Sequence, residues 1–234
     1  MCVVAIAWEA HPRWRLLVAG NRDELHTRPS APVARWQDQS DIIAGRDLVS
    51  KGTWMGVSDS GRFAVVTNIR NADGPDPDKK SRGDLVADWL HSGHVTDELG
   101  DFNPFNLIVT GHQSAELLSN RPMPLRQPMQ PGIHGLSNAI PDEHWPRTDR
   151  LVAEISDWLT GPAADLQELF GLLIDETIPD PDAIPVFIRS PIYGTRCSTV
   201  IAVDRQGQGQ IIERRFGPDG EPGGQTKIDF VWAI

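Results

Sequence analysis

The chain has 234 residues, of which 39% are hydrophobic, and this suits one fairly large domain or two small ones. Because no linker is long enough to split the chain, we expect a single domain spanning residues 1–234. Its formal net charge is -10, which makes it a poor candidate for binding nucleic acid or an anionic membrane. No apolar run approaches the ~18 residues of a membrane span, and no basic region precedes the apolar start, as it would in a signal peptide. We therefore expect a cytoplasmic protein without a membrane span.

Two β-hairpins are predicted in the first third of the chain. Residues 2–8 (CVVAIAW) and 14–20 (WRLLVAG) are apolar and β-prone, and the five residues between them contain a proline and charges. Residues 21–32 (NRDELHTRPSAP) are polar, and we expect a loop there. Residues 52–58 and 62–69 flank the turn sequence DSG and form the second hairpin.

A helix and a third hairpin follow a charged, proline-rich loop at 71–83. The apolar spacing in SRGDLVADWLHSG predicts a helix over 81–93 that ends at its glycine. Residues 105–111 (FNLIVTG) and 115–120 (AELLSN) make the hairpin, and residues 133–139 (IHGLSNA) are a short strand entering a loop.

The last third of the chain combines helices with strands. Apolar residues at helical spacing predict one helix over 146–160, with Pro146 at its start and Gly161 just past its end, and a second over 164–175. Four strands are predicted after them, at 183–194, 197–204, 209–216 and 227–234. This order of hairpins and separate helices predicts an α+β fold with antiparallel sheets.

Cys2 lies at the position that becomes the N-terminus if Met1 is removed, and the small side chain of cysteine favours that removal. The exposed α-amine would have a pKa of about 7.7–8.0. It can therefore accept the thiol proton near neutral pH, so that one residue supplies both nucleophile and base. If Met1 is retained, this chemistry is absent. The other cysteine, Cys197, lies in a strand-like stretch and is interpreted as a buried structural thiol; two free thiols are expected rather than a disulfide.

The tetrapeptide NRDE, residues 21–24, is predicted to lie beside Cys2. In an antiparallel hairpin the end of the second strand lies next to the start of the first. Arg22 would favour the thiolate of Cys2, and Asp23 could hold the amine or Arg22 in position. Asn68 and Asn138 end strand-like runs, where their amides could donate hydrogen bonds to an oxyanion. Arg196 precedes another strand and is a further cation for the same site.

Eight motifs occur in order along the chain, namely MC, AGNRDE, KGTWMGV, TNIRN, SRGDLV, NPFNLIV, GLSNA and YGTRCSTV. Together they resemble the NRDE family, which is the family of transport and Golgi organisation protein 2. The resemblance implies the fold of the N-terminal nucleophile hydrolases. That fold is a four-layer αββα sandwich of two stacked, mainly antiparallel sheets flanked by helices.

The resemblance also implies roles for individual residues. The penicillin V acylase and bile-salt hydrolase group is similar to this chain in its N-terminal cysteine, matched here by Cys2. Its arginine and aspartate resemble Arg22 and Asp23, although the register over NRDE is not unique. Its oxyanion asparagines resemble Asn68 and Asn138, and its late arginine resembles Arg196. Within the same motifs we predict three substrate-binding residues, which are Asn21, Trp54 and Asn71.

Several functions remain open from the sequence. The leading one is hydrolysis of a non-peptide C–N amide bond in a small molecule, without a cofactor or metal. The alternatives that the resemblance implies are haem binding in haem trafficking, and lipid or acyl-CoA handling. A Cys–His hydrolase with His26 or His134 as base is a further alternative, but it leaves the terminal placement of Cys2 unexplained. His91 and His94 end a predicted helix, and we expect them to be solvated rather than metal ligands.

Overall fold

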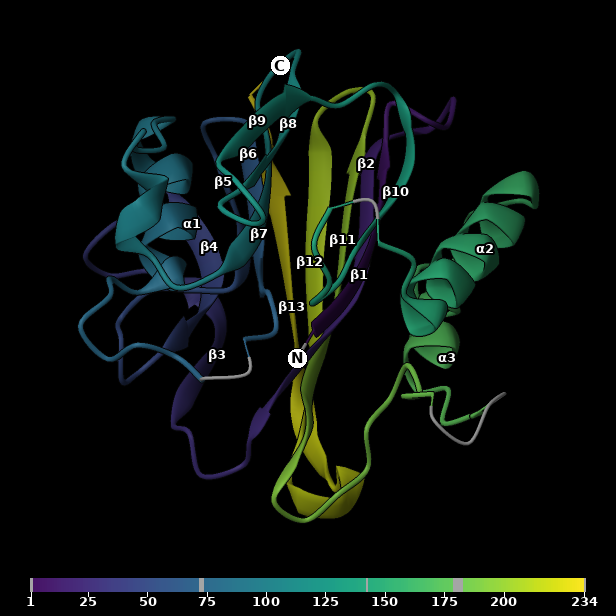
Figure 1. The fold of residues 1–234 in the computed structure, drawn as a ribbon. Coiled ribbons are helices and arrows are strands. Elements are labelled where there is room, and N and C mark those ends of the chain that lie inside the picture. Colours follow the sequence, from purple (N-terminus) through teal and green to yellow (C-terminus); the bar gives the residue numbers. More distant parts are fainter. Residues whose placement is uncertain (1, 72–73, 142, 179–182, 234) are drawn as a thin grey trace. The chain divides into compact units, whose positions relative to one another are not determined.

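The structure, a computed structural model, describes residues 2–71, 74–141, 143–178 and 183–233 (Figure 1). The chain divides into two compact units, each assembled from three separated segments. The first unit contains the described residues of 1–27, 131–137 and 144–229, and the second those of 28–130, 138–143 and 230–234. Neither unit is a continuous piece of chain. That residues 1–234 form a single domain stays a prediction.

Among the described residues, the first unit contains a six-stranded sheet whose pairings β10–β1, β1–β2, β2–β11 and β11–β12 are antiparallel. In spatial order its strands are β10 (Gly132–Leu136), β1 (Cys2–Trp8), β2 (Trp14–Leu25), β11 (Tyr193–Asp204), β12 (Gln208–Phe216) and β13 (Pro222–Val231). A short 3-10 turn, Pro218–Gly220, precedes β13.

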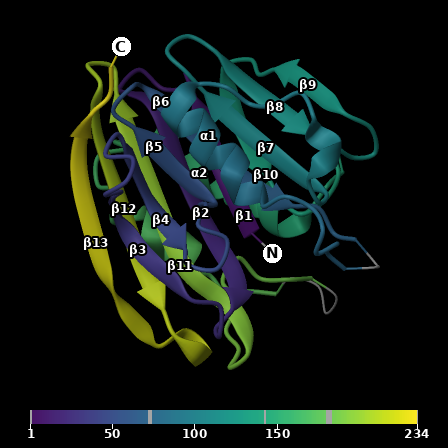
Figure 2. The ribbon, with the colours of Figure 1, turned by 90° about the vertical axis from the view of Figure 1, so that its left-hand side faces the viewer.

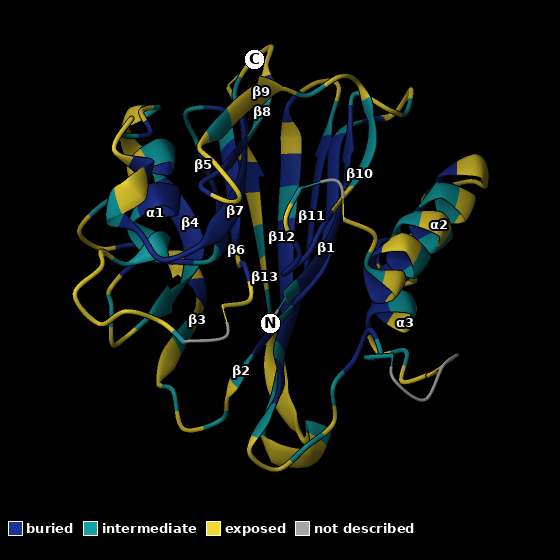
Figure 3. Ribbon diagram, in the orientation of Figure 1, coloured by how far each residue is buried: buried dark blue, intermediate teal, exposed yellow. Residues whose placement is uncertain are grey.

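The predicted hairpin of β1 and β2 is confirmed, but β2 is longer than expected. It continues through NRDE to Leu25, where the sequence predicts a loop. The reason is that Asn21 and Asp23 are buried and hydrogen-bonded to distant segments, which compensates these polar residues for leaving water. After Cys2, β1 is buried throughout its length, as Figure 3 shows.

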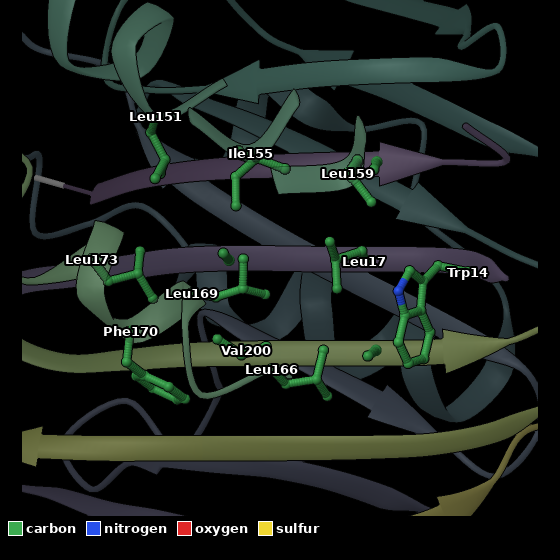
Figure 4. Close-up of a cluster of buried hydrophobic side chains, with 14 of the residues drawn as sticks. Trp14, Leu17, Leu151, Ile155, Leu159, Leu166, Leu169, Phe170, Leu173 and Val200 are labelled. Carbon is green, nitrogen blue, oxygen red and sulfur yellow. The ribbon is translucent and has the colours of Figure 1, made fainter. Parts of the chain in front are cut away.

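Helices α2 (Pro146–Thr160) and α3 (Leu169–Leu173) cover one face of this sheet. Figure 4 shows Leu151, Ile155 and Leu159 of α2 packed with side chains of the strands and of α3. The bounds predicted for α2 are confirmed, whereas α3 is much shorter than the predicted 164–175. The Asp165 side chain accepts a hydrogen bond from the backbone of Gln167, and such a local bond favours a turn over a helix.

The predicted strand at 183–194 is wrong, since β11 begins only at Tyr193. Pro185 and Pro191 lack the N–H that a strand needs for its ladder. The last predicted strand begins earlier than expected, at Pro222 rather than 227, and ends at Val231. Residue 234 lies outside the described residues.

The second unit contains, in its described part, a seven-stranded antiparallel sheet in which spatial order follows chain order. Its strands are β3 (Ser30–Arg35), β4 (Ile42–Asp47), β5 (Met55–Ser58), β6 (Arg62–Asn68), β7 (Phe105–Thr110), β8 (Ala115–Ser119) and β9 (Leu125–Pro128). The hairpins β5–β6 and β7–β8 are confirmed, whereas β3, β4 and β9 were not predicted.

Helix α1 (Arg82–Ser92) lies across this second sheet, as Figure 2 shows. The Ser81 hydroxyl accepts a hydrogen bond from the backbone N–H of Gly83, and Gly93 ends the helix in a left-handed conformation (φ 72°). The prediction for 81–93 is therefore confirmed. A 3-10 turn, Leu99–Asp101, leads to β7. No helix in the described part of the chain is long and apolar enough to span a membrane.

Candidate active site

Cys2 lies directly opposite Arg22 in the β1–β2 ladder, and Cys197 of β11 lies opposite Arg22 on its other side. Side chains directly opposite each other on antiparallel strands share one face of the sheet, about 5 Å apart at Cβ. Val3 and Ala5 belong to the core beneath α2 and α3, so the alternation of the strand puts Cys2 on the opposite face. The predicted juxtaposition of Cys2 with NRDE is thus confirmed.

Cys2 is partly buried and is not part of a disulfide. Burial raises the pKa of the Cys2 thiol above its ordinary value, and the negative charge of Asp23 raises it further. A hydrogen bond from the Asp23 backbone and the positive charge of Arg22 lower the same pKa. Arg22 in turn lies 3.8 Å from the carboxylate of Glu24, with little of its side chain exposed. The charge of Arg22 thus opposes the effect of burial on the Cys2 thiol, while its predicted role in catalysis stays a prediction.

Asp23 points to the helix-covered face and is fully withdrawn from water. Its Oδ2 lies 2.8 Å from each terminal nitrogen of Arg147, and its Oδ1 accepts a 2.8 Å hydrogen bond from Thr195. Its backbone carbonyl accepts a hydrogen bond from the Tyr193 hydroxyl at 3.0 Å. The sequence predicts that Asp23 holds the amine or Arg22, and the structure adds these three partners from α2 and β11.

Arg196 lies in a bulge of β11, because the register with β2 shifts between Thr195 and Cys197. Its Nη1 donates to the backbone carbonyls of Leu25 at 2.8 Å and His26 at 3.2 Å. Burial lowers the pKa of Arg196, and the nearby charge of Arg22 lowers it further. Bulges re-aim side chains and often occur beside active sites. The cations Arg22 and Arg196 therefore lie close together on the adjacent strands β2 and β11.

Cys197 is buried, as the sequence predicts, and burial strongly raises the pKa of its thiol. It is separated from Cys2 by the intervening strand β2, so their backbones are about 9.6 Å apart. A disulfide needs Cα atoms within about 7 Å. The two cysteines therefore cannot bridge without rearranging the sheet, and both are free thiols.

Asn21 is fully buried on the helix-covered face. Its amide nitrogen donates to the carbonyls of Leu173 at 2.7 Å and Val186 at 2.9 Å, and its oxygen accepts from the Ser198 hydroxyl at 2.6 Å. These contacts are typical of a structural role, because they tie β2 to β11 and to the segment around α3. Its predicted role in substrate binding stays a prediction.

The other predicted site residues lie in the second unit. Asn68 ends β6, and its backbone carbonyl accepts a 2.5 Å hydrogen bond from the side chain of Asn138. The carbonyl of Asn138 accepts from the backbone N–H of Arg70 at 3.0 Å. Asn71 is exposed and donates to the carbonyl of Gly74 at 3.0 Å. The two asparagines predicted for the oxyanion are thus joined to each other, while their catalytic role stays a prediction.

Trp54 is partly buried just before β5, and its carbonyl accepts a hydrogen bond from the backbone of Val66 at 2.8 Å. Gly52, two residues before Trp54, packs directly on Gly83 in the first turn of α1. A Cβ added to Gly52 would lie 2.5 Å from the Gly83 backbone. The motifs KGTWMGV and SRGDLV therefore fit together through their glycines. This contact fixes the loop that carries Trp54.

The histidines considered from the sequence lie in separate places. His26 Nε2 is 3.1 Å from the carbonyl of Ser190, and burial lowers the pKa of its ring. His134 lies on β10 opposite Ile6. His91 is 3.4 Å from Asp41. Among the described residues, no cluster of three or more His, Cys, Asp and Glu side chains is arranged to hold a metal ion.

Arg147 and Thr195 are the residues at this site that sequence reasoning missed. Arg147 occurs in the first turn of α2, which the sequence identifies only by its apolar face. Thr195 occurs in the motif YGTRCSTV, where attention falls on the arginine and the cysteine. The position of Arg147 could have been informative. A cation in the first turn of a helix is disfavoured by the positive end of the helix dipole. A cation there suggests a specific buried anion as partner.

Solved structures identify the class of fold. The chain is similar to a Caenorhabditis elegans N-acylethanolamine-hydrolyzing acid amidase ortholog, with a TM-score of 0.55 and 13% identity over 86% of this chain and 92% of that one. It is also similar to penicillin V acylase from Agrobacterium tumefaciens (TM-score 0.54, 13% identity, 92% and 83% covered). A third similar structure is the mutant C2A conjugated bile acid hydrolase from Clostridium perfringens (0.54, 9%, 97% and 92%).

At such identities the likeness is one of fold, and the predicted N-terminal nucleophile hydrolase-like α+β fold is confirmed. Comparison of the sequence identifies the family within this class of fold. The family model Transport and Golgi organisation 2 matches residues 1–218. The homologs from Mus musculus and Bos taurus are 29% and 31% identical to the chain, each with 92% of both chains covered. The chain belongs to the Transport and Golgi organisation 2 family, as its motifs predict.

Proposed function

We propose that the protein hydrolyses a non-peptide amide bond of a small molecule, with Cys2 as the nucleophile after Met1 is removed. The observation that carries the proposal is the direct pairing of Cys2 with Arg22 at the start of β1, in a chain with the fold of N-terminal nucleophile acylases. Met1 itself lies outside the described residues. Its removal is part of the proposal.

The reaction would run in two steps through a thioester. The α-amine of Cys2 takes the thiol proton, and the thiolate attacks the amide carbonyl carbon. The C–N bond breaks, the nitrogen leaves as an amine carrying that proton, and the acyl group stays on sulfur. Water then adds to the thioester, the C–S bond breaks, and a carboxylic acid is released as the thiol regains its proton.

The surrounding residues support the thiolate and the developing charge. The cation of Arg22 opposes the effect of burial on the Cys2 thiol. Arg196 adds a second positive charge on the neighbouring strand. The roles of Asn68 and Asn138 as oxyanion donors, and of Asn21, Trp54 and Asn71 in substrate binding, follow from the family resemblance.

The likeness to three acylases suggests which amides to test. Their names state an N-acylethanolamine, penicillin V and a conjugated bile acid as the compounds on which those proteins act. One of them was studied as its C2A mutant, so a cysteine at position 2 is a shared feature. We extend to this chain only the reaction class, which is hydrolysis of an N-acyl amide.

The test compares two forms of the protein. One is released from a cleavable fusion so that Cys2 is its first residue, and the other retains Met1. Both are incubated with the three amides, and product acids and amines are measured by liquid chromatography and mass spectrometry. We expect hydrolysis only by the form that begins at Cys2, and a loss of about a thousandfold or more in Cys2→Ser. Equal rates in Cys2→Ser would exclude Cys2 as nucleophile.

Haem binding, and lipid or acyl-CoA handling, are alternatives that rest on the family resemblance alone. A thiolate ligand to haem iron would involve the same Cys2. Titration with haem would then give a saturable shift of the Soret band that Cys2→Ser alters. A shift that is the same in Cys2→Ser would place any haem elsewhere. The cytoplasmic location stays a prediction.

A further inference from the structure

The charged side chain that α2 buries closest to the candidate nucleophile is Arg147. It lies in the first turn of the helix and is only 3% exposed. Its Nη2 donates to the carbonyl of Val186 at 2.8 Å as well as to Asp23. One guanidinium thus joins α2 to β2 and to the segment that precedes β11.

The contact with Asp23 is the feature that needs explanation. Both terminal nitrogens of Arg147 approach the same carboxylate oxygen at 2.8 Å, while the other oxygen accepts from Thr195. A carboxylate removed from water is destabilised by several kcal/mol unless a cation compensates it. Arg147 is the cation that pairs with Asp23 on the helix-covered face of the sheet.

Asp23 also touches the nucleophile through its backbone. Asp23 follows Arg22, which lies directly opposite Cys2 in the ladder. A hydrogen bond from the Asp23 backbone lowers the pKa of the Cys2 thiol, and the charge of the Asp23 carboxylate raises it. The Tyr193 hydroxyl holds the carbonyl of the same residue. Asp23 is thus restrained at its carboxylate and at its carbonyl, and these restraints fix where its N–H points.

We propose that Arg147 is a positioning residue for Cys2. It compensates the buried Asp23 charge and holds the Asp23 backbone where its N–H reaches the thiol. The role deepens the proposed hydrolase function and rests on it, because it matters for catalysis only if Cys2 is the nucleophile.

Charged and titratable groups on four elements of this unit lie around the site. They are Arg22, Asp23 and Glu24 on β2, Tyr193, Arg196 and Cys197 on β11, Glu213 and Arg215 on β12, and Arg147 on α2. Of these, the charge of Asp23 raises the pKa of the Cys2 thiol and the charge of Arg22 lowers it. Arg147 differs from the other cations in that it acts on Asp23 rather than on the thiol directly.

The experiment measures the pKa of the Cys2 thiol without any substrate. The rate of alkylation by iodoacetamide is followed from pH 6 to 10, and peptide mass spectrometry separates Cys2 from Cys197. In Arg147→Met the Asp23 charge is uncompensated, and we expect alkylation of Cys2 at pH 7.5 to slow about tenfold, equivalent to one pKa unit. The double variant Arg147→Met/Asp23→Asn lacks the Asp23 charge as well as the Arg147 charge. Its rate of Cys2 alkylation should therefore return close to that of the wild type.

Two further variants complete the design. Arg147→Lys keeps the charge but loses the two terminal nitrogens of the guanidinium. The rate of Cys2 alkylation in this variant should therefore lie between those of wild type and Arg147→Met. Arg150→Met on the same helix is the matched control. It breaks the ion pairs of Arg150 with Glu154 and with Asp175, which lies beyond α3, and it should leave Cys2 alkylation unchanged. Circular dichroism checks that each variant is folded.

An unchanged rate in folded Arg147→Met would overturn the proposal, as would a double variant as slow as the single one. If Arg147→Met does not fold, Arg147→Lys and the double variant decide. A wild-type rate in Arg147→Lys together with a slowed double variant would then overturn it. Because no substrate is used, a positive result with no amide turnover would refute the hydrolase function alone.

Discussion

Cys2 and Arg22 occupy one rung of the β1–β2 ladder, with the thiol and the guanidinium on the face of the sheet away from α2 and α3. The pairing follows from the five-residue loop between Trp8 and Trp14, which sets the register of the hairpin. A shift of one residue would turn Arg22 to the helix-covered face. The register is therefore what brings the cation to the nucleophile.

Replacing Arg22 should raise the pKa of the Cys2 thiol. In Arg22→Gln the charge that lowers the thiol pKa is gone, so the pKa rises and alkylation of Cys2 at pH 7.5 falls about tenfold. Iodoacetamide labelling across pH checks the shift. Arg15→Gln is a suitable control, since Arg15 lies at the far end of β2 and also pairs with a glutamate, Glu9 at 3.2 Å. An equal shift in both variants would refute the specific role of Arg22.

Alkaline pH should destabilise the protein through Cys197. Its thiol has a pKa raised above the ordinary value of 9.0 by burial and by Glu213. The unfolded chain therefore loses this proton at a lower pH than the folded one. The stabilisation is complete below about pH 9 and declines as pH rises further, by up to ~1.4 kcal/mol per pH unit. Urea unfolding of Cys197→Ala between pH 8 and 10.5 should show a smaller decline than wild type, and an identical slope would contradict this.

Asn21 should contribute to stability more than its polar character suggests. Asn21→Ala leaves the carbonyls of Leu173 and Val186 and the hydroxyl of Ser198 without this partner, and we expect a loss of about 2–4 kcal/mol in the free energy of unfolding. The exposed Asn71→Ala serves as control and should change stability by less than ~0.5 kcal/mol. Urea denaturation measures both. Similar small losses would show that the buried network is dispensable.

The whole chain should unfold as one domain. Each compact unit is built from three separated segments, so unfolding one unit pulls on segments whose ends belong to the other. We expect a single calorimetric transition whose van't Hoff enthalpy equals the measured enthalpy. Two resolved transitions would instead mean that the units are independent domains.

The regular elements were largely predictable because their signals are local. Two apolar, β-prone runs separated by a short polar loop indicate the hairpin of β1 and β2, and Pro146 and Gly161 mark the ends of α2. The short or polar strands β3 and β9 have no such pattern. The polar run NRDE reads as a loop because its compensating hydrogen bonds come from residues far along the chain.

At the candidate site, too, only the contacts set by local sequence patterns could be predicted. The hairpin register is a local property, so the approach of Arg22 to Cys2 could be predicted. Arg147 is 124 residues from Asp23, and no local pattern connects them. The bulge that holds Arg196 depends on the pairing of β11 with β2, which is equally remote in sequence.

The central claim is that Cys2 becomes acylated by an amide. Intact-mass spectrometry of protein that begins at Cys2, quenched with acid during turnover of an amide, tests it most directly. We expect a mass increase equal to the acyl group, located on the Cys2 peptide and absent from Cys2→Ala and from protein that retains Met1. Amide hydrolysis that continues undiminished in Cys2→Ala, with no acyl adduct on Cys2 in the wild type, would contradict it.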